Sequence, residues 1–177
     1  MIIRWDRFNL YLSWLLAMAL LGGCRTAEGK RRHQPTVFRI HQEVHHDGTS
    51  ENLPVPIYRQ SPVMVNVEKI PFLSELNVSE AKVIDVIGGF AISVQFDRQG
   101  VWLLEEHSIA SRGRRFAIHA QWGKKLKEAR WLAAPVISRR ISDGVLTFTP
   151  DSTREEADEI VLGLNNVARA VKKKEAW

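Results

Sequence analysis

The fold is decided by Lys82–Ile118, which reads KVIDVIGGFAISVQFDRQGVWLLEEHSIASRGRRFAI. The first half of this stretch holds two apolar segments, Lys82–Ile87 and Phe90–Phe96, on either side of Gly88-Gly89. Glycine adopts the positive φ that tight hairpin turns require, and short apolar segments bounded by a turn suit strands. This half therefore predicts an antiparallel hairpin.

The second half of the stretch predicts a helix and another strand. Asp97 can cap a helix that runs to about Ser111, and Gly113 suits the left-handed position after its last turn. A strand then follows at Phe116–Gln121. The helix residues expected on the core side are Val101, Leu104, Ser108 and Ile109, and core packing is also the interpretation of Trp102.

Alternating apolar residues and turn signals predict further extended segments on both sides of this stretch. Asp47-Gly48 is expected to turn the chain after the first segment. Asp143-Gly144 is expected to fold the last two into a second hairpin, with a bulge or bend at Pro135. The segments are Val37–Val44, Val55–Arg59, Val63–Glu68, Trp131–Ile141 and Val145–Thr149.

The C-terminal helix has the clearest start signal of any element. Thr153 and Glu156 have the spacing of a capping box, and apolar residues then repeat at intervals of three and four. Lys172–Lys174 lie where cations complement the helix dipole. Together with the helix after Asp97, this order predicts an α+β fold with a mainly antiparallel sheet and two helices packed on one face.

Residues 1–24 have the features of an export signal. Arg4 and Arg7 precede an apolar run, Leu10–Leu21, that is shorter than the ~20 residues of a spanning helix. The run ends in Leu21-Gly22-Gly23-Cys24, which is similar to the lipobox of bacterial lipoproteins. A buried N-terminal helix is the alternative, but such a helix would show polar residues every three or four positions.

These features predict a lipoprotein with lipid attached at Cys24, the single cysteine of the chain. The expected parts are a signal peptide at 1–23, a tether at 24–35, a domain at 36–172 and a basic tail at 173–177. The protein is expected to be membrane-anchored and to face the periplasm. Arg25, where an aspartate would indicate inner-membrane retention, favours the outer membrane.

The formal net charge is +5, with clusters such as Lys30-Arg31-Arg32 and Lys172-Lys173-Lys174. A solvated face is the favoured interpretation of these clusters. The alternative outside the cytoplasm is a binding surface for anionic phospholipid or an acidic partner, rather than for nucleic acid. No nucleophile elbow, phosphate loop or His-Glu-x-x-His motif occurs, so neither an enzyme nor a cofactor is predicted. His41, His45 and His46 are interpreted as solvated turn histidines and not as metal ligands.

The second half of the chain resembles the head subdomain of the first periplasmic domain of SecD and SecDF, accessory subunits of the bacterial protein translocase. The resemblance extends over about Val55–Lys172 and is strongest from Phe90 to Leu164. It rests on the order and spacing of Ile92–Gly100, Arg112–Ile118, Ala134–Ser138, Ile141–Gly144, Phe148-Thr149 and Glu155–Ala157.

The resemblance implies a head that contacts unfolded polypeptide on the far side of the membrane and assists its export. No stretch after Cys24 approaches the ~20 apolar residues of a spanning helix, so proton-driven transport by this chain is not expected. The predicted function is non-catalytic binding of exported polypeptide or of a translocase subunit, and a docking module of another envelope complex is the alternative. An exposed Trp122 or Trp131 beside a sheet edge that accepts an added strand is the candidate peptide contact.

Overall fold

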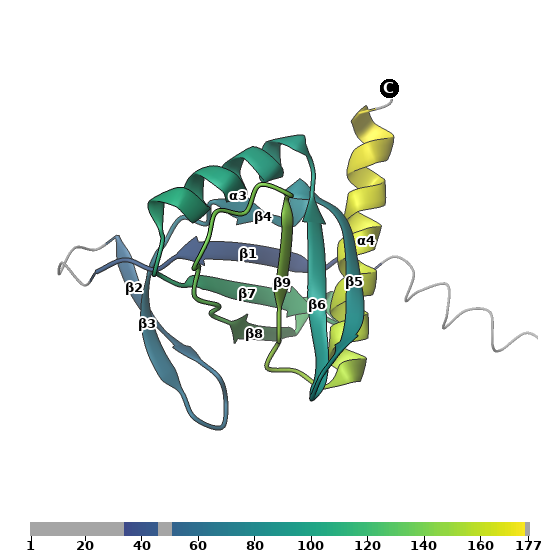
Figure 1. Cartoon of the computed structure of the whole chain (residues 1–177). Helices are drawn as coiled ribbons and strands as arrows, with labels where there is room; N and C mark the ends of the chain where they lie inside the picture. Colours follow the sequence, from purple (N-terminus) through teal and green to yellow (C-terminus); the bar gives the residue numbers. More distant parts are fainter. Residues whose placement is uncertain (1–33, 46–50, 176–177) are drawn as a thin grey trace, which may run out of the picture. The chain divides into compact units, whose positions relative to one another are not determined.

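The computed structural model describes residues 34–45 and 51–175, which belong to one compact unit (Figure 1). The signal peptide, the lipobox with Cys24, most of the tether and the turn at Asp47-Gly48 lie outside the described residues. Within the described ranges, no helix is both long enough and apolar enough to cross a membrane.

The strands form three antiparallel sheets, and two helices accompany them (Figure 1). The four-stranded sheet has the order β4 (Leu73–Ser74), β1 (Val37–Gln42), β7 (Phe116–Trp122) and β8 (Glu128–Ala133). The three-stranded sheet has the order β5 (Val78–Val86), β6 (Gly89–Phe96) and β9 (Val145–Phe148), and β2 (Asn52–Ile57) pairs with β3 (Val63–Glu68). The helices are α3 (Arg98–Ala110) and α4 (Arg154–Glu175), with 3-10 turns η1 (Glu75–Asn77) and η2 (Lys124–Leu126). The predicted α+β class is confirmed, although the strands divide among three sheets.

The main core lies between the two larger sheets, whose strands run in crossing directions in Figure 1. Such steep crossing is typical of orthogonal sheet packing, in which alternate residues of each strand point inward. The rings of Phe38 and Phe148 stack across the core with centroids 6.3 Å apart, one from each sheet. Leu104 of α3 and Leu164 of α4 are fully buried in the same cluster. Both helices therefore close one shared core.

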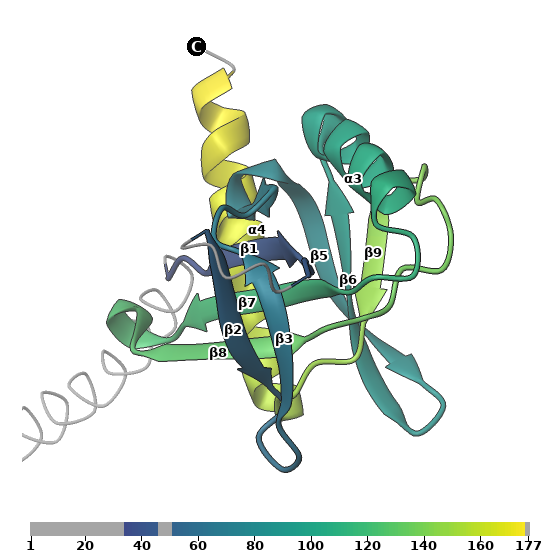
Figure 2. The same ribbon diagram turned by 90° about the vertical axis from the view of Figure 1, so that its left-hand side faces the viewer.

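A second, smaller core lies on the outer face of the four-stranded sheet, where the β2–β3 hairpin covers it (Figure 2). The buried side chains of this hairpin are Val55, Ile57, Val65 and Val67. They pack against Ala117, which points away from the main core because side chains alternate along β7.

Both helix starts confirm the sequence signals. Asp97 Oδ1 accepts a hydrogen bond from Gly100 N–H at 2.7 Å. At α4, Glu156 N–H donates to Thr153 Oγ1 (3.2 Å) and Thr153 N–H donates to Glu156 Oε2 (2.9 Å), which is a reciprocal capping box. The helix continues to Glu175, so Lys173 and Lys174 form its last turn and not a separate tail.

The expected second hairpin is wrong. The segment Val145–Phe148 does not pair with Trp131–Ile141 but joins β6, where Ser93 stands opposite Thr147. The preceding segment is instead held by Ile137, whose N–H donates to Arg114 O and whose C=O accepts from Gly113 N–H, both at 2.8 Å. A bulge or bend was expected at Pro135. The register shift between β7 and β8 instead lies opposite Ile118 and His119 of β7, and β8 ends at Ala133 before that proline.

The core-facing side of α3 was also predicted incompletely. Leu104 and Ser108 are buried as expected, but Ile109 is 56% exposed and Trp102 is 62% exposed. With about 100° of rotation per residue, Trp102 lies roughly opposite Leu104 around the helix. The aromatic side chain therefore points to solvent.

Candidate functional site

The two tryptophans chosen from the sequence lie on opposite faces of the four-stranded sheet. Trp122 is 1% exposed in the main core, with the guanidinium of Arg130 5.1 Å from its ring centroid, so the expectation that it is exposed is wrong. Trp131 is half-buried on β8 and packs against the smaller core. The structure does not bring these two side chains to one surface.

Trp131 lies between two histidines on the outer face of the sheet. Its ring centroid is 5.2 Å from that of His41 and 5.0 Å from that of His119. The Nδ1 atom of His41 is 2.7 Å from the carbonyl oxygen of Glu68 on β3. Burial is the main cause that lowers the pKa of both histidines, and the charge of Arg39 lowers both further. This aromatic cluster secures the hairpin to the sheet.

The open edges of the sheets are the places where an extended peptide could add as a new strand. The β5 edge is closed by α4, because Asn165 Oδ1 accepts from Ala81 N–H and Asn165 Nδ2 donates to Ala81 O, both at 2.9 Å. On β3, Asn66 O accepts from Val44 N–H at 2.9 Å. On β2, Pro54 and Pro56 carry no N–H and offer no donors.

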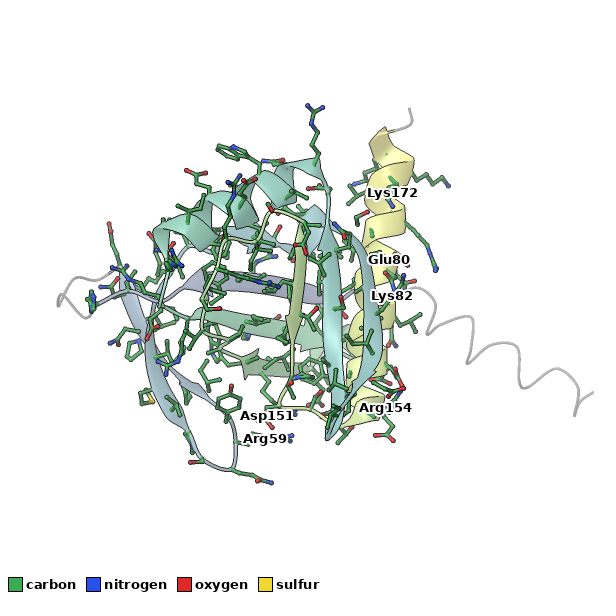
Figure 3. All side chains as sticks on the ribbon, viewed as in Figure 1. Arg59, Glu80, Lys82, Asp151, Arg154 and Lys172 are labelled. Atoms are coloured by element: carbon green, nitrogen blue, oxygen red, sulfur yellow. The ribbon has the colours of Figure 1, made fainter. Side chains whose placement is uncertain are left out.

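The β8 edge is partly closed by the loop before α4. Leu132 O accepts from Asp151 N–H at 2.7 Å, and Arg130 Nη1 donates to Asp151 O at 3.0 Å. Arg59 holds the same loop from the β2–β3 connection, with its backbone N–H 2.8 Å from Asp151 Oδ2 (Figure 3). Partial burial alone would raise the pKa of Asp151, but the hydrogen bonds and charge of Arg59 outweigh it and lower the pKa.

The β9 edge differs, because its outward-facing backbone groups include an unused donor and acceptor. Phe96 N–H donates to Gly144 O at 3.0 Å. This bond shows which residues of the two strands bond to each other, because every second residue of an antiparallel strand faces its partner. Leu146 and Phe148 therefore bond to β6, and the N–H and C=O of Val145 and Thr147 point away from it. Val145 N–H donates to Asp143 Oδ1 at 3.1 Å. Among the described residues, no backbone hydrogen bond from another segment closes this edge at Thr147.

A cavity of about 440 Å³ lies against this open edge. We call it the edge groove; it is formed by residues 135–143 on one side and by Val145–Thr147 on the other. The 135–143 segment is fixed from its far side, since Ile141 N–H donates to Ser108 Oγ at 2.9 Å and Arg140 is ion-paired with Glu105. The walls of the groove are therefore held apart by contacts that do not involve its interior.

The chemistry of the edge groove suits a main chain more than a small substrate. Thr147 presents one backbone donor and one acceptor, and Val136 presents an apolar side chain that is 55% exposed. An extended peptide could pair with Thr147 while its side chains contact Val136. Sequence reasoning missed these residues because it paired 131–141 with 145–149; Pro135, which cannot donate, was the signal against that pairing.

The described residues hold no group of three histidine, cysteine, aspartate or glutamate side chains placed to bind a metal ion. His41 packs on Trp131, and His107 stacks on Phe72 with ring centroids 4.1 Å apart. Burial lowers the pKa of His107 as well. These histidines serve packing in the described domain.

Comparison with known proteins shows the fold. No protein-family model matches the chain, and no curated protein matches it. A solved structure of SecDF, described as a membrane component that enhances protein export, aligns over 82% of this chain and 70% of its own, with a TM-score of 0.57 and 20% identity. A structure of SecDF in its super-membrane-facing form aligns over 81% of this chain with a TM-score of 0.55 and 20% identity, and the match spans 21% of that protein. The resemblance predicted from the sequence is thus confirmed at the level of the fold: the described domain is built like part of SecDF.

Proposed function

We propose that this protein is a lipid-anchored head that binds extended polypeptide at the β9 edge during protein export. The observation that carries the proposal is the open edge itself, with an unused donor and acceptor at Thr147 beside a cavity. Each of the other sheet edges considered has at least one outward backbone group that a side chain or another segment occupies, or that a proline removes.

Strand addition suits a client that has not folded. The hydrogen bonds run between main chains, so they do not depend on the client sequence, and a shallow apolar contact such as Val136 adds affinity without strict selection. An unfolded segment has free backbone donors and acceptors, whereas a folded protein has satisfied most of its own. The groove therefore favours unfolded segments.

The fold likeness to SecDF supports a role in export. SecDF is described as a membrane component that enhances protein export, and its structure aligns over 82% of this chain. The head is proposed to act without catalysis and without a cofactor, on exported polypeptide or on a translocase subunit.

The location follows from Cys24. Lipid attached there, with residues 25–35 as a tether, would hold the head at the periplasmic face of a membrane, with the outer membrane favoured. Palmitate labelling of the parent chain and of Cys24→Ala, followed by membrane fractionation, tests this. We expect label and membrane association in the parent and no label in the variant; an unlabelled, soluble parent would overturn the anchor.

A photo-crosslinking residue placed at Val136 tests polypeptide binding. In cells that export a protein held unfolded, we expect adducts with that protein from position 136 and none from Ile87, which is fully exposed on the β5–β6 turn. Adducts with one folded envelope protein, and none with the unfolded client, would favour the docking-module alternative.

The variant Thr147→Pro makes the test specific. It removes the outward N–H while leaving the β6 ladder intact, and Thr147→Val is the matched control that keeps the N–H but loses the hydroxyl. We expect Thr147→Pro to abolish the adduct and Thr147→Val to retain it. Equal adducts from both variants would contradict strand addition.

A further inference from the structure

The two ends of α4 carry opposite charge. Its first turns hold acidic residues, namely Glu155, Glu156, Asp158 and Glu159. Its last turns hold Arg169, Lys172, Lys173 and Lys174, and all four are exposed. The helix dipole favours cations at this end, but three consecutive lysines also repel one another. A partner of negative charge would relieve that repulsion.

These four cations lack acidic partners in the described part of the chain. None of them forms an ion pair there, and Lys172 Nζ is 3.4 Å from the carbonyl oxygen of Ser79 (Figure 3). Nearby, Glu80 is already paired with Lys82 at 3.1 Å. Among the described side chains, none therefore neutralises the positive charge at this end of α4.

Two large exposed apolar side chains accompany the cations. Leu76 is 58% exposed on η1, and Trp102 is 62% exposed near the start of α3. η1 packs against α4, and Asn77 lies so close to Gly100 that an added Cβ there would be 3.1 Å from the Asn77 Cβ. Both ribbon views place α3 and the last turns of α4 at the same end of the domain (Figures 1 and 2).

The chain enters the domain beside the same helix. Asn166 Nδ2 donates to Gln34 O at 3.0 Å, and an added Cβ on Gly163 would collide with Thr36. Gln34 is ten positions after Cys24, so a fully extended tether reaches at most about 35 Å. If Cys24 carries lipid, as proposed above, this side of the domain stays within that distance of the bilayer.

We propose that this end of the domain docks on a membrane surface that contains anionic phospholipid. We call it the basic end; it consists of Arg169, Lys172, Lys173, Lys174, Leu76 and Trp102. Lysines near an anionic surface are attracted to its headgroups, while tryptophan and leucine enter the interfacial region. The tether favours lipid over an acidic protein, because it holds the basic end near headgroups whether or not a protein partner is present.

The test uses the full chain reconstituted in vesicles of phosphatidylcholine, with or without phosphatidylglycerol. An environment-sensitive fluorophore on Ala170→Cys reports on the basic end, and one on Ser61→Cys reports on the β2–β3 connection; both positions are exposed. We expect an apolar shift at position 170 only with phosphatidylglycerol, and none at position 61. High salt should abolish the shift, since it screens exposed charges.

Matched charge variants decide the assignment. Lys172→Gln/Lys173→Gln/Lys174→Gln should lower the ratio of docked to undocked heads by about fivefold per lysine, on the order of 100-fold together. Lys124→Gln/Lys125→Gln/Lys127→Gln removes the same charge from the loop after β7 and should change nothing. A shift that is equal in both lipids, or that survives the first variant, would overturn the proposal, as would a shift produced by an acidic protein but not by phosphatidylglycerol.

The proposal rests on the proposed anchor, yet the two fail separately. Failure of palmitate labelling would remove the tether, but an apolar shift at position 170 that requires phosphatidylglycerol and the three lysines would still show lipid docking of the basic end. Failure of crosslinking at Val136 would count against the edge groove and would leave lipid docking of the basic end in place.

Discussion

The two outer strands of the three-stranded sheet, β5 and β9, show how one sheet can have one closed and one open edge. At β5, the side-chain amide of Asn165 satisfies both backbone groups of Ala81, and α4 lies along the strand. At β9, the backbone groups of Thr147 face a cavity. The closed edge contributes stability to the domain, whereas the open edge is where we propose that another chain binds.

Proteins usually protect an open strand edge, because it can pair with other copies and aggregate. Here the segment 135–143 shields β9 without pairing with it. The edge is therefore accessible to a single extended segment entering the groove and poorly accessible to the flat edge of a second sheet.

The largest expected effect comes from loosening the closed side. Leu164→Ala removes a fully buried α4 side chain from the main core and should lower the free energy of unfolding by about 2–5 kcal/mol. Leu162→Ala, on the exposed side of the same helix, should cost well under half of that. Chemical denaturation measures both; equal losses would contradict the docking of α4 through Leu164.

A smaller loss is expected from opening the β5 edge alone. Asn165→Ala leaves the N–H and C=O of Ala81 without their partners and should cost about 1–3 kcal/mol. Hydrogen exchange at the Ala81 amide should become faster. Asn166→Ala, which loses one bond to Gln34, is the control and should leave exchange at Ala81 unchanged.

A proline in the open edge should cost little stability. Thr147→Pro removes no ladder donor, so its free energy of unfolding should stay within about 1 kcal/mol of the parent, while polypeptide crosslinking is lost. Thermal denaturation measures the stability. A loss as large as that of Leu164→Ala would mean that Thr147 N–H does pair within the domain.

Acidification should weaken the domain without changing which edge is open. The folded state lowers the pKa of His41, His107 and His119 from the usual value of 6.5, mainly by burial, so it binds fewer protons than the unfolded state. The neutral forms therefore support stability above about pH 6.5, and that support declines as the pH falls further. Melting temperatures should fall with the pH, and less steeply in His119→Gln; an identical slope in that variant would contradict a contribution from His119.

Elements whose signals are local were predictable from the sequence. The turn of the β5–β6 hairpin contains Gly88, and Gly89 is the first residue of β6. Asp97 caps α3, and the pair Thr153 and Glu156 starts α4. Each of these contacts joins residues a few positions apart, so a short segment of sequence includes both partners. The family resemblance included Asp97 and Glu156 among its positions and led to the right fold.

The partner of β9 could not be predicted in the same way, because strand pairing is a choice between distant segments. Val145–Thr149 looked like the second arm of a local hairpin, yet Leu146 and Phe148 are buried in the main core beside β6. Trp122 and Trp131 were indistinguishable in the sequence for a related reason. Because side chains alternate along a strand, Trp122 of β7 and Trp131 of β8 lie on opposite faces of the sheet. Their burial, however, depends on the segments that cover each face, and the β2–β3 hairpin covers the face of Trp131.

Amide hydrogen exchange at Thr147, measured with and without an unfolded polypeptide, is the most direct test of the open edge. Strand addition predicts that the Thr147 amide exchanges freely alone and becomes protected when the polypeptide binds, while the Ala81 amide is protected in both states. Binding of the polypeptide with no added protection at Thr147, or protection there before it is added, would contradict the account.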